Sequence, residues 1–191
     1  MARYSPEHKE ATRRRMIETA GRRFKSDGLD GSGIATLVAD AGLTNGAFYG
    51  HFTSKDDLIA SVVAQQLADQ VAVVSTLPTG LQSLEAFIRD YLSPAHRDDR
   101  ADGCPSAALL DEIARRATTT RQVFTDELLG TADDIAARLN PTDASRIDAL
   151  TLFGFMIGTL QVARALTDQD LSNQLLARGV ETALKLLDDW A

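Results

Sequence analysis

The stretch GIATLVADAGLTNGAFYGHF, residues 33–52, decides the fold. Its first part predicts a short helix, because Ile34, Leu37 and Val38 lie at the spacing of one helix face. Gly42 should end this helix, and a second short helix should fill the last third of the stretch. Two short helices joined by a tight glycine-containing turn form a helix-turn-helix, whose second helix enters the major groove of DNA. Such helix pairs also occur in proteins without that role, so the pattern predicts a DNA-binding unit only together with further motifs.

Helical periodicity extends on both sides of this stretch. Apolar residues three and four apart predict an amphipathic helix over residues 6–27, with arginines around its solvent side. Ser54 and Asp57 make a capping box that starts a long helix running to about Val74. The longest loop is expected over residues 94–103, and because no run of period two predicts a strand, the predicted fold class is all-α. Further helices are predicted over residues 81–92, 105–117, 121–139, 142–166 and 168–190.

The charge of the chain is divided unevenly along its length. The formal net charge of -7 argues by itself against a nucleic-acid partner. Residues 1–55, however, carry nine Lys and Arg against six Asp and Glu, whereas residues 56–191 carry eleven against twenty-one. This asymmetry predicts a basic module that contacts nucleic acid, joined to an acidic body with a different function. The alternative is that the uneven distribution of charge arose by chance.

The sequence predicts neither a metal site nor a cofactor. Its single cysteine, Cys104, cannot form an internal disulfide, and it lies at no metal-ligand spacing from His8, His51 or His96. The longest uncharged stretch, residues 149–163, is too short to span a bilayer, and charges rather than an apolar segment follow the first residues. We therefore expect a cytoplasmic protein with no membrane attachment.

Residues 33–52, with Ser54-Lys55-Asp56-Asp57-Leu58 after them, resemble the signature of the TetR family of bacterial transcriptional regulators almost position by position. The match to the first helix of that family is carried by Ile17, Ala20, Phe24 and Gly28. The resemblance covers roughly the first 60 residues and is limited to helical layout beyond them. It implies an N-terminal three-helix DNA-binding domain with a helix-turn-helix, residues 1–55, and a larger helical ligand-binding and dimerisation domain, residues 56–191.

The resemblance also implies which residues contact DNA. Four side chains suited to phosphate oxygens take that role: Thr44, Tyr49, His51 and Lys55. Ser32, as the cap of the first short helix, and Thr36 within it are expected beside neighbouring phosphates. Base edges are expected to face Asn45, Gly46, Ala47 and Phe48. Phe48 fits the core equally well, and Gly50 replaces a larger polar residue, so we expect specificity to depend on backbone approach and DNA shape.

The region from Ala149 to Leu166 is nearly all apolar or small, and a helix apolar on every side must be buried on several sides. The same helix of a second subunit would cover it across a two-fold axis, with packing inside one subunit as the alternative. The resemblance implies dimerisation through the last two helices, and the expected interface residues are Phe155, Leu160, Leu176, Val180 and Leu184. It also implies a ligand pocket between the middle helices, with the expected lining Phe87, Tyr91, Leu109, Ile113, Phe124, Leu128, Phe153 and Met156.

Cys104 is a further candidate ligand-site residue. Pro105 suits the first position of a helix, which would put the thiol at the N-cap, where the helix dipole favours thiolate. Asp98, Asp99 and Asp102 precede it and would oppose a second negative charge. One hypothesis for Cys104 is therefore that it senses electrophiles or oxidants.

The function expected from the sequence is that of a ligand-responsive repressor. A homodimer would bind a palindromic double-stranded DNA operator and be released by a small-molecule inducer. The alternatives are an architectural DNA-binding dimer without a ligand and the thiol-based sensor. An enzyme is not expected, because Cys104 and His96 are the only nucleophile and base worth pairing, and no third orienting group is evident.

Overall fold

A computed structural model describes residues 6–138 and 145–190 of the chain, so the expected helix ends at Leu139 and Thr142 lie outside the described residues. Within these ranges the chain forms ten α-helices and no strand, which confirms the all-α prediction. The helices are α1 (Pro6–Asp27), α2 (Ile34–Asp40), α3 (Asn45–Tyr49), α4 (Lys55–Ser75), α5 (Leu81–Tyr91), α6 (Pro94–Asp98), α7 (Pro105–Ala114), α8 (Thr118–Ala136), α9 (Ser145–Ala165) and α10 (Gln169–Trp190).

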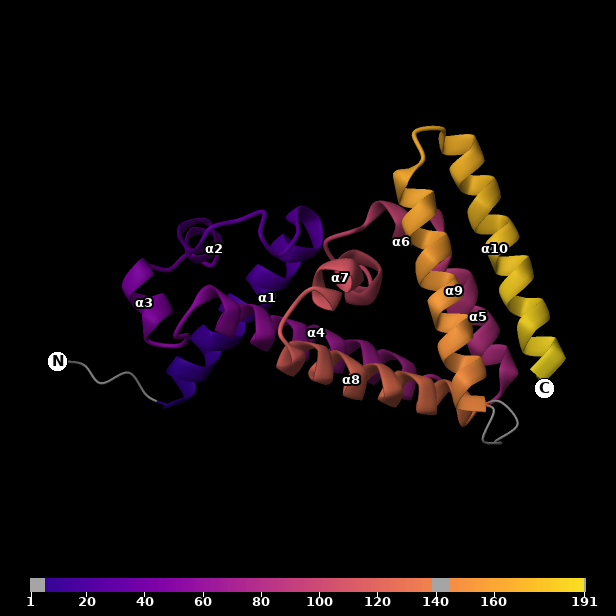
Figure 1. The fold of residues 1–191 in the computed structure, drawn as a ribbon, viewed down its shortest axis with the longest axis horizontal. Helices are drawn as coiled ribbons and strands as arrows, with labels where there is room; N and C mark the ends of the chain where they lie inside the picture. Colours follow the sequence, from indigo (N-terminus) through magenta and orange to yellow (C-terminus); the bar gives the residue numbers. More distant parts are fainter. Residues whose placement is uncertain (1–5, 139–144, 191) are drawn as a thin grey trace.

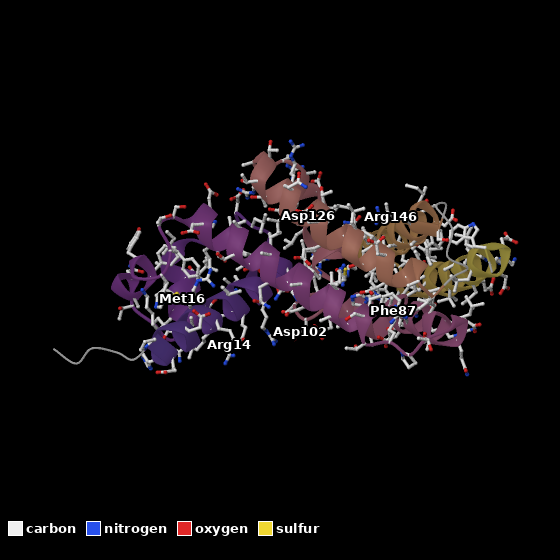
Figure 2. All side chains as sticks on the ribbon, turned by 90° about the horizontal axis from the view of Figure 1, so that it is seen from below. Arg14, Met16, Phe87, Asp102, Asp126 and Arg146 are labelled. Carbon is white, nitrogen blue, oxygen red and sulfur yellow. The ribbon has the colours of Figure 1, made fainter. Side chains whose placement is uncertain are left out.

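The molecule has two ends joined by a long helix (Figure 1). We call residues 6–54, which hold α1, α2 and α3, the head, and the described residues from 55 onward the body. Helix α4 leaves the head and runs along α8, while α9 and α10 lie side by side at the far end. Figure 2 shows the same division, with Met16 in the head, Phe87 toward the far end of the body and Asp102 between them.

The head's apolar core is completed by two helices of the body. From the head itself it takes Met16, Ile17, Ala20, Phe24, Leu29, Leu37, Val38, Ala41, Phe48 and Phe52. The first half of α4 adds Leu58, Ile59, Val62, Val63 and Leu67, and α7 adds Leu109 and Ile113. The head therefore packs on α4 and α7 rather than forming a separate core, and movement of either helix would be felt in the head.

The body has a second core around α9. Its largest buried residues come from α5, α9 and α10 and include Ile88, Phe153, Met156, Leu160, Leu176 and Leu187. Helix α9 is buried along much of its length, as expected for a helix that is apolar on most sides. Helices α4 and α9 are also long and apolar enough to cross a membrane by length and composition alone, a test that core helices of globular proteins pass as well.

Two predicted helix starts are confirmed by their caps. The Ser54 hydroxyl accepts a hydrogen bond from the Asp57 backbone N–H at 3.1 Å, as predicted for the start of α4. A capping box would have the Asp57 side chain accept from the N–H of Ser54, the N-cap. Asp57 instead accepts from the N–H of the preceding residue, Thr53, at 2.8 Å. Cys104 is the N-cap of α7, with Pro105 at the first helical position. These caps orient α4 and α7, the two helices on which the head packs.

Ser32 does not cap α2, contrary to the sequence prediction. Gly33 is the N-cap residue, and no side chain among the described residues caps it. The stretch expected to be the longest loop contains α6 instead, because Pro94 occupies the first helical turn and the Ser93 hydroxyl accepts from the His96 N–H at 3.1 Å. A cap and a proline were thus sufficient to start a helix of five residues in a charged segment.

Candidate nucleic-acid interface and ligand cavity

Helix α3 is held to the head by one side chain and otherwise faces solvent. Phe48 is fully buried in the head's core, and its ring lies 5.6 Å from that of Phe52. Burial of a side chain of this size stabilises the packing by about 1.5–3 kcal/mol. Asn45 and Gly46 are exposed, and Tyr49 is 66% exposed. The helix therefore presents a polar and aromatic outer face to a partner.

Two residues expected at the DNA are covered by the protein. Phe48 cannot touch a thymine methyl, since none of its side chain is exposed. Ser32 is 7% exposed, and its hydroxyl lies 3.4 Å from an Asp27 carboxylate oxygen, so it has little surface left for a phosphate. Of the two roles left open for Phe48, its burial supports the core, whereas the burial of Ser32 contradicts its expected place beside a phosphate.

The other predicted contact residues lie on the head's surface or at its edge. Thr44 caps α3, and its hydroxyl accepts from the Ala47 N–H at 3.4 Å; Thr36 is exposed on α2. Ala47 is partly buried. Lys55, at the first position of α4, has its ammonium 3.9 Å from an Asp30 carboxylate oxygen. At that distance the ion pair is weak, and the ammonium can exchange Asp30 for a phosphate.

A basic hollow lies between the start of α1 and the end of α3. Its volume is about 350 Å³, and it is lined by Pro6, Lys9, Glu10, Arg13, Gly50 and His51. Arg13 is held in place there, donating to the Ser61 hydroxyl at 3.0 Å, with its guanidinium 5.3 Å from the centre of the Phe52 ring. His51 Nδ1 is buried and finds no hydrogen-bond partner in the described part of the chain. The pKa of His51 is lowered mainly by burial of its ring, and the nearby positive charges of Lys9 and Arg13 lower it further. The hollow thus offers donors and positive charge to an anion.

A larger cavity of about 580 Å³ lies in the body between α4, α5 and the connection from α6 to α7. Four residues expected to line a ligand pocket do line it: Phe87, Tyr91, Cys104 and Phe153. The other five expected lining residues pack elsewhere. Leu109 and Ile113 belong to the head's core, Phe124 packs against that core, Leu128 packs against the body's core, and Met156 is fully buried in the latter. Apolar periodicity was sufficient to predict that these residues are buried, but it does not indicate which core or cavity each of them joins.

The polar lining residues were not predicted. From α4 come Gln66, Asp69 and Gln70, and α1 of the head contributes Lys25. Three polar residues at i, i+3 and i+4 in an otherwise apolar helix are a signal that the sequence does contain. Lys25 donates to the Gly103 carbonyl at 3.0 Å, and burial lowers the pKa of its ammonium. Through Lys25 the cavity touches the head directly.

Cys104 lines the cavity with its thiol engaged on two sides. The sulfur accepts the Ala107 N–H at 3.4 Å and donates to Gln70 Oε1 at 3.0 Å. Burial raises the pKa of the thiol, and the nearby Tyr91 hydroxyl and the backbone N–H groups at the start of α7 oppose that shift. The N-cap position is as predicted, but the expected displacement toward thiolate is wrong, because loss of solvent outweighs the helix terminus.

His96 fixes the wall of the cavity through both ring nitrogens. Nδ1 donates to the Tyr91 carbonyl at 2.7 Å, and Nε2 accepts the Cys104 backbone N–H at 3.0 Å. Only the neutral ring can do both, and burial lowers the pKa of His96 in agreement with that state. The ring is therefore a structural link between α5, α6 and α7 and does not serve Cys104 as a base.

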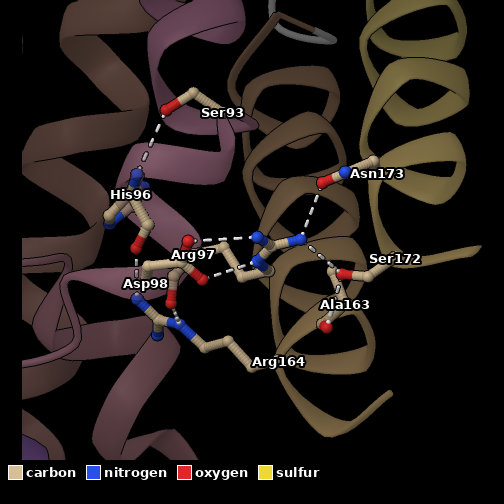
Figure 3. Close-up of polar contacts among 8 residues, drawn as sticks. All are labelled: Ser93, His96, Arg97, Asp98, Ala163, Arg164, Ser172 and Asn173. Atoms are coloured by element: carbon tan, nitrogen blue, oxygen red, sulfur yellow. Dashed lines mark hydrogen bonds and ion pairs between the residues drawn. The ribbon is translucent and has the colours of Figure 1, made fainter. Parts of the chain in front are cut away.

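A buried polar network ties α6 to the last two helices (Figure 3). Arg97 donates to the Ser172 hydroxyl at 2.9 Å and to Asn173 Oδ1 at 2.8 Å, both in α10. From α9, Arg164 donates to the carbonyls of His96 at 2.9 Å and Arg97 at 3.1 Å. The cavity wall at His96 is thus connected by hydrogen bonds to the α9–α10 pair.

Comparison with known protein families finds a match within the head and the start of α4. Residues 16–62 match the model of the bacterial regulatory proteins of the tetR family, and this range contains α2, α3 and the start of α4. Over these residues the chain is similar to the tetR family. The matched range ends at Val62, where α4 is still part of the head's core.

A curated transcriptional regulator matches a similarly short part of the chain. Over 62 residues the chain is 32% identical to the HTH-type transcriptional regulator AcrR of Shigella flexneri. That match spans 32% of this chain and 29% of AcrR, so it covers less than a third of the relative's length.

Several solved structures match most of the fold. Escherichia coli NemR in its reduced form has a TM-score of 0.77 at 16% identity, covering 91% of this chain and 95% of that chain. A TetR-family regulator from Agrobacterium tumefaciens has a TM-score of 0.73 at 20% identity, with coverages of 91% and 98%. Bacillus subtilis FadR, in complex with stearoyl-CoA, has a TM-score of 0.66 at 18% identity, with coverages of 91% and 96%. At these identities the likeness establishes the fold of the body and nothing finer.

Proposed function

We propose that this chain is a cytoplasmic, ligand-responsive transcriptional repressor, which binds a near-palindromic DNA operator as a homodimer and is released by a small-molecule inducer. The observation that carries the proposal is the geometry of α3. Its buried Phe48 fixes the helix, while Asn45 and Tyr49 point outward next to the basic hollow. We divide the chain into a DNA-binding domain, residues 1–55, and a ligand-binding and dimerisation domain, residues 56–191, with the head's core shared across that boundary.

In this proposal α3 enters the major groove. Asn45 reads base edges, because an amide can pair bidentately with adenine. Tyr49, Thr44 and Lys55 contact phosphates around the groove. The basic hollow receives a further phosphate oxygen, which would supply the missing partner of His51 Nδ1.

The proposed dimer forms through exposed residues of α9 and α10. Leu160 and Leu176, which the sequence suggested for the interface, are already covered by their own subunit at 0% and 1% exposure. Phe155, Val180 and Leu184 remain partly exposed. A continuous stripe on α9 lies open to a second copy and consists of Ile147, Thr151, Gly154, Phe155, Gly158 and Val162. A two-fold axis along it would set two recognition helices roughly 34–36 Å apart, the spacing of successive major grooves.

The cavity favours a ligand sensor over an architectural DNA-binding dimer. Its volume of about 580 Å³ falls within the range of about 300–1,000 Å³ that is usual for small-molecule sites. A filled body would be expected of a purely architectural protein. FadR, which shares the fold, is described in complex with stearoyl-CoA, so a body of this architecture can hold a ligand.

Helix α4 connects the two activities. Its first residue, Lys55, lies at the proposed DNA surface, and Gln66 and Gln70 line the cavity further along the same helix. A ligand that selects a different position of α4 would change the separation of the two heads and so release the operator. The proposal assigns no catalytic role, because both nitrogens of His96 are engaged by backbone groups.

Selection of DNA from a random pool by the purified full-length protein tests the proposal. We expect enrichment of a two-fold-symmetric site, bound with an affinity that falls steeply as salt is raised. Tyr49→Phe should weaken binding by roughly three- to tenfold, as expected for loss of one phosphate hydrogen bond. Glu85→Gln, an α5 change outside the proposed DNA surface, serves as the matched control. A folded dimer that enriches no sequence would overturn the assignment.

A further inference from the structure

Two polar groups that line the body's cavity lack hydrogen-bond partners. Tyr91 is 5% exposed, its ring lines the cavity, and its hydroxyl has no partner among the described residues. Gln70 lines the opposite wall on α4, and its Nε2 is likewise buried and unpaired within the described part of the chain. An unsatisfied buried donor is costly, so two of them in one cavity indicate a place where a ligand supplies the missing partner.

The orientation of the Gln70 amide follows from its neighbours. The Cys104 sulfur already accepts the Ala107 N–H at 3.4 Å, so its thiol hydrogen is free to donate to Gln70 Oε1 at 3.0 Å. The Ser106 hydroxyl donates to the same oxygen at 3.3 Å. With Oε1 occupied twice, the NH₂ group is the part of the amide left for a ligand. Gln70 and Tyr91 can then both donate to one acceptor atom.

Aromatic rings form the apolar part of the cavity. The Phe87 and Tyr91 ring centres lie 5.8 Å apart, and those of Tyr91 and Phe153 lie 5.9 Å apart. Val73 and Val74 of α4 line the same space. Such a row of rings suits a flat aromatic molecule, which can stack or lie edge-on against them.

The edge of the cavity carries negative charge. Four exposed aspartates line it: Asp69, Asp90, Asp99 and Asp102. Asp102 is paired with Arg22 at 2.9 Å, which leaves three carboxylates beside the cavity. Among the described lining residues Lys25 is the one with a positive charge, and its ammonium is turned to the Gly103 carbonyl. At this edge of the cavity, the three carboxylates disfavour a carboxylate ligand relative to an uncharged one.

We propose that the cavity binds an uncharged aromatic compound whose oxygen acceptor receives hydrogen bonds from Tyr91 and Gln70, and that it discriminates against carboxylates. The inference rests on the ligand-sensing function proposed above and names the chemistry of that ligand. The aromatic wall supplies affinity, the two donors supply orientation, and the acidic edge supplies selectivity.

Three probes with one skeleton separate these contributions: benzophenone, diphenylmethane, which lacks the oxygen, and 4-benzoylbenzoate, which adds a carboxylate. Titration calorimetry on the full-length protein gives their affinities. We expect benzophenone to bind about tenfold more tightly than diphenylmethane and about tenfold more tightly than 4-benzoylbenzoate, as two modest hydrogen bonds and like-charge repulsion imply. Asp90→Asn should improve 4-benzoylbenzoate binding and leave benzophenone unaffected.

Two variants test the donors. Tyr91→Phe and Gln70→Leu should each reduce the preference for benzophenone over diphenylmethane, while Gln122→Leu, an exposed glutamine on α8, should preserve it. Circular dichroism establishes that each variant is folded, and either donor variant alone suffices if the other fails to fold. Equal affinity for benzophenone and diphenylmethane, tightest binding of the carboxylate, or no binding of any probe would overturn the inference.

The operator assay on the same preparations keeps this inference distinct from the regulator proposal. Operator binding without probe binding overturns the ligand class and leaves the DNA-binding function standing. If the probes bind with the stated preference but no DNA sequence is selected, the ligand class stands and the DNA-binding function is overturned.

Discussion

The carboxylate of Glu112 accepts a hydrogen bond from the backbone N–H of Leu29 at 2.8 Å. Leu29 lies in the head and is fully buried, whereas Glu112 belongs to α7, which begins at Cys104 on the cavity. The chain reaches Leu29 through Gly28, whose φ of +84° is strained for any residue with a side chain. The bond therefore joins the turn after α1 to the helix that carries the cavity wall.

Replacing Glu112 tests the importance of this bond. Glu112→Ala leaves the Leu29 N–H without its acceptor, and we expect the free energy of unfolding to fall by about 1–3 kcal/mol. Urea denaturation followed by circular dichroism measures the change. Asp111→Ala is the control, since Asp111 is exposed and forms only a surface pair with Arg115, which should contribute little. Equal stability of the two variants would mean that the Leu29–Glu112 bond does not hold the head to α7.

Tyr91 offers a prediction in which stability and ligand binding change in opposite directions. Its buried hydroxyl lacks a partner among the described residues, so Tyr91→Phe removes an unsatisfied group without creating a large space. We expect the unliganded variant to be more stable than the wild type by about 1 kcal/mol. Thermal unfolding of both proteins without ligand measures this difference. A clear loss of stability would show that the hydroxyl has a partner, such as ordered water, in solution.

The pH dependence of stability should reflect His96. Its pKa is lowered in the folded protein, mainly by burial, so below about pH 6.5 the unfolded chain binds a proton that the folded chain does not. The contribution of His96 to the free energy of unfolding is thus fully present above about pH 6.5. It is lost as the pH falls from there to the lowered pKa of His96 in the folded protein. Protonation also removes the acceptor for the Cys104 N–H.

Urea denaturation between pH 5 and 8 measures this effect. His96→Gln should show a shallower decline of stability below pH 6.5 than the wild type. His51, whose pKa is also lowered, contributes in the same direction and is retained in both proteins. If His96→Gln declines as steeply as the wild type, another group is responsible.

Local patterns in the sequence were sufficient to predict most helices and the face of α3. The Ser54–Asp57 cap and the position of Cys104 were predictable because a cap depends only on residues one turn apart. Phe48 was not assignable between DNA and core, since a five-residue helix is too short for periodicity to define its buried face. Its full burial leaves Asn45 and Tyr49 as the outward side chains of α3.

The cavity depends on tertiary packing that periodicity does not contain. Leu109 and Ile113 have the apolar spacing expected of pocket residues, yet α7 turns them toward the head. Lys25 reaches the cavity from a helix that the sequence assigned wholly to DNA binding. Of the aromatic residues that the resemblance suggested for the pocket, Phe87, Tyr91 and Phe153 line the cavity, whereas Phe124 of α8 packs against the head's core.

The buried thiol of Cys104 should react slowly. Burial raises its pKa, and its sulfur donates to Gln70, so little thiolate is present at pH 7. We expect iodoacetamide to modify the folded protein at least about tenfold more slowly than the urea-unfolded chain, as mass spectrometry would record. Cys104→Ser should also be released from the operator by ligand as the wild type is. Rapid modification of the folded protein, together with loss of release in Cys104→Ser, would instead support the thiol-sensor reading.

Gly50 provides a test of how α3 would read DNA in the proposed function. It is the C-cap of α3, with a φ of -77° that any residue adopts, and an added Cβ would lie 3.3 Å from the Ala47 carbonyl oxygen. Gly50→Ala should therefore fold normally, with at most a small adjustment at the helix end.

The methyl group would nevertheless stand between the backbone and the DNA, beside the basic hollow that Gly50 helps to line. If specificity depends on close backbone approach and DNA shape, the variant should lose discrimination at one or more base pairs, each worth about 1–3 kcal/mol. A scan of every single-base change in the selected operator, performed with both proteins, measures this, and identical preference profiles would assign specificity to side chains such as Asn45 alone.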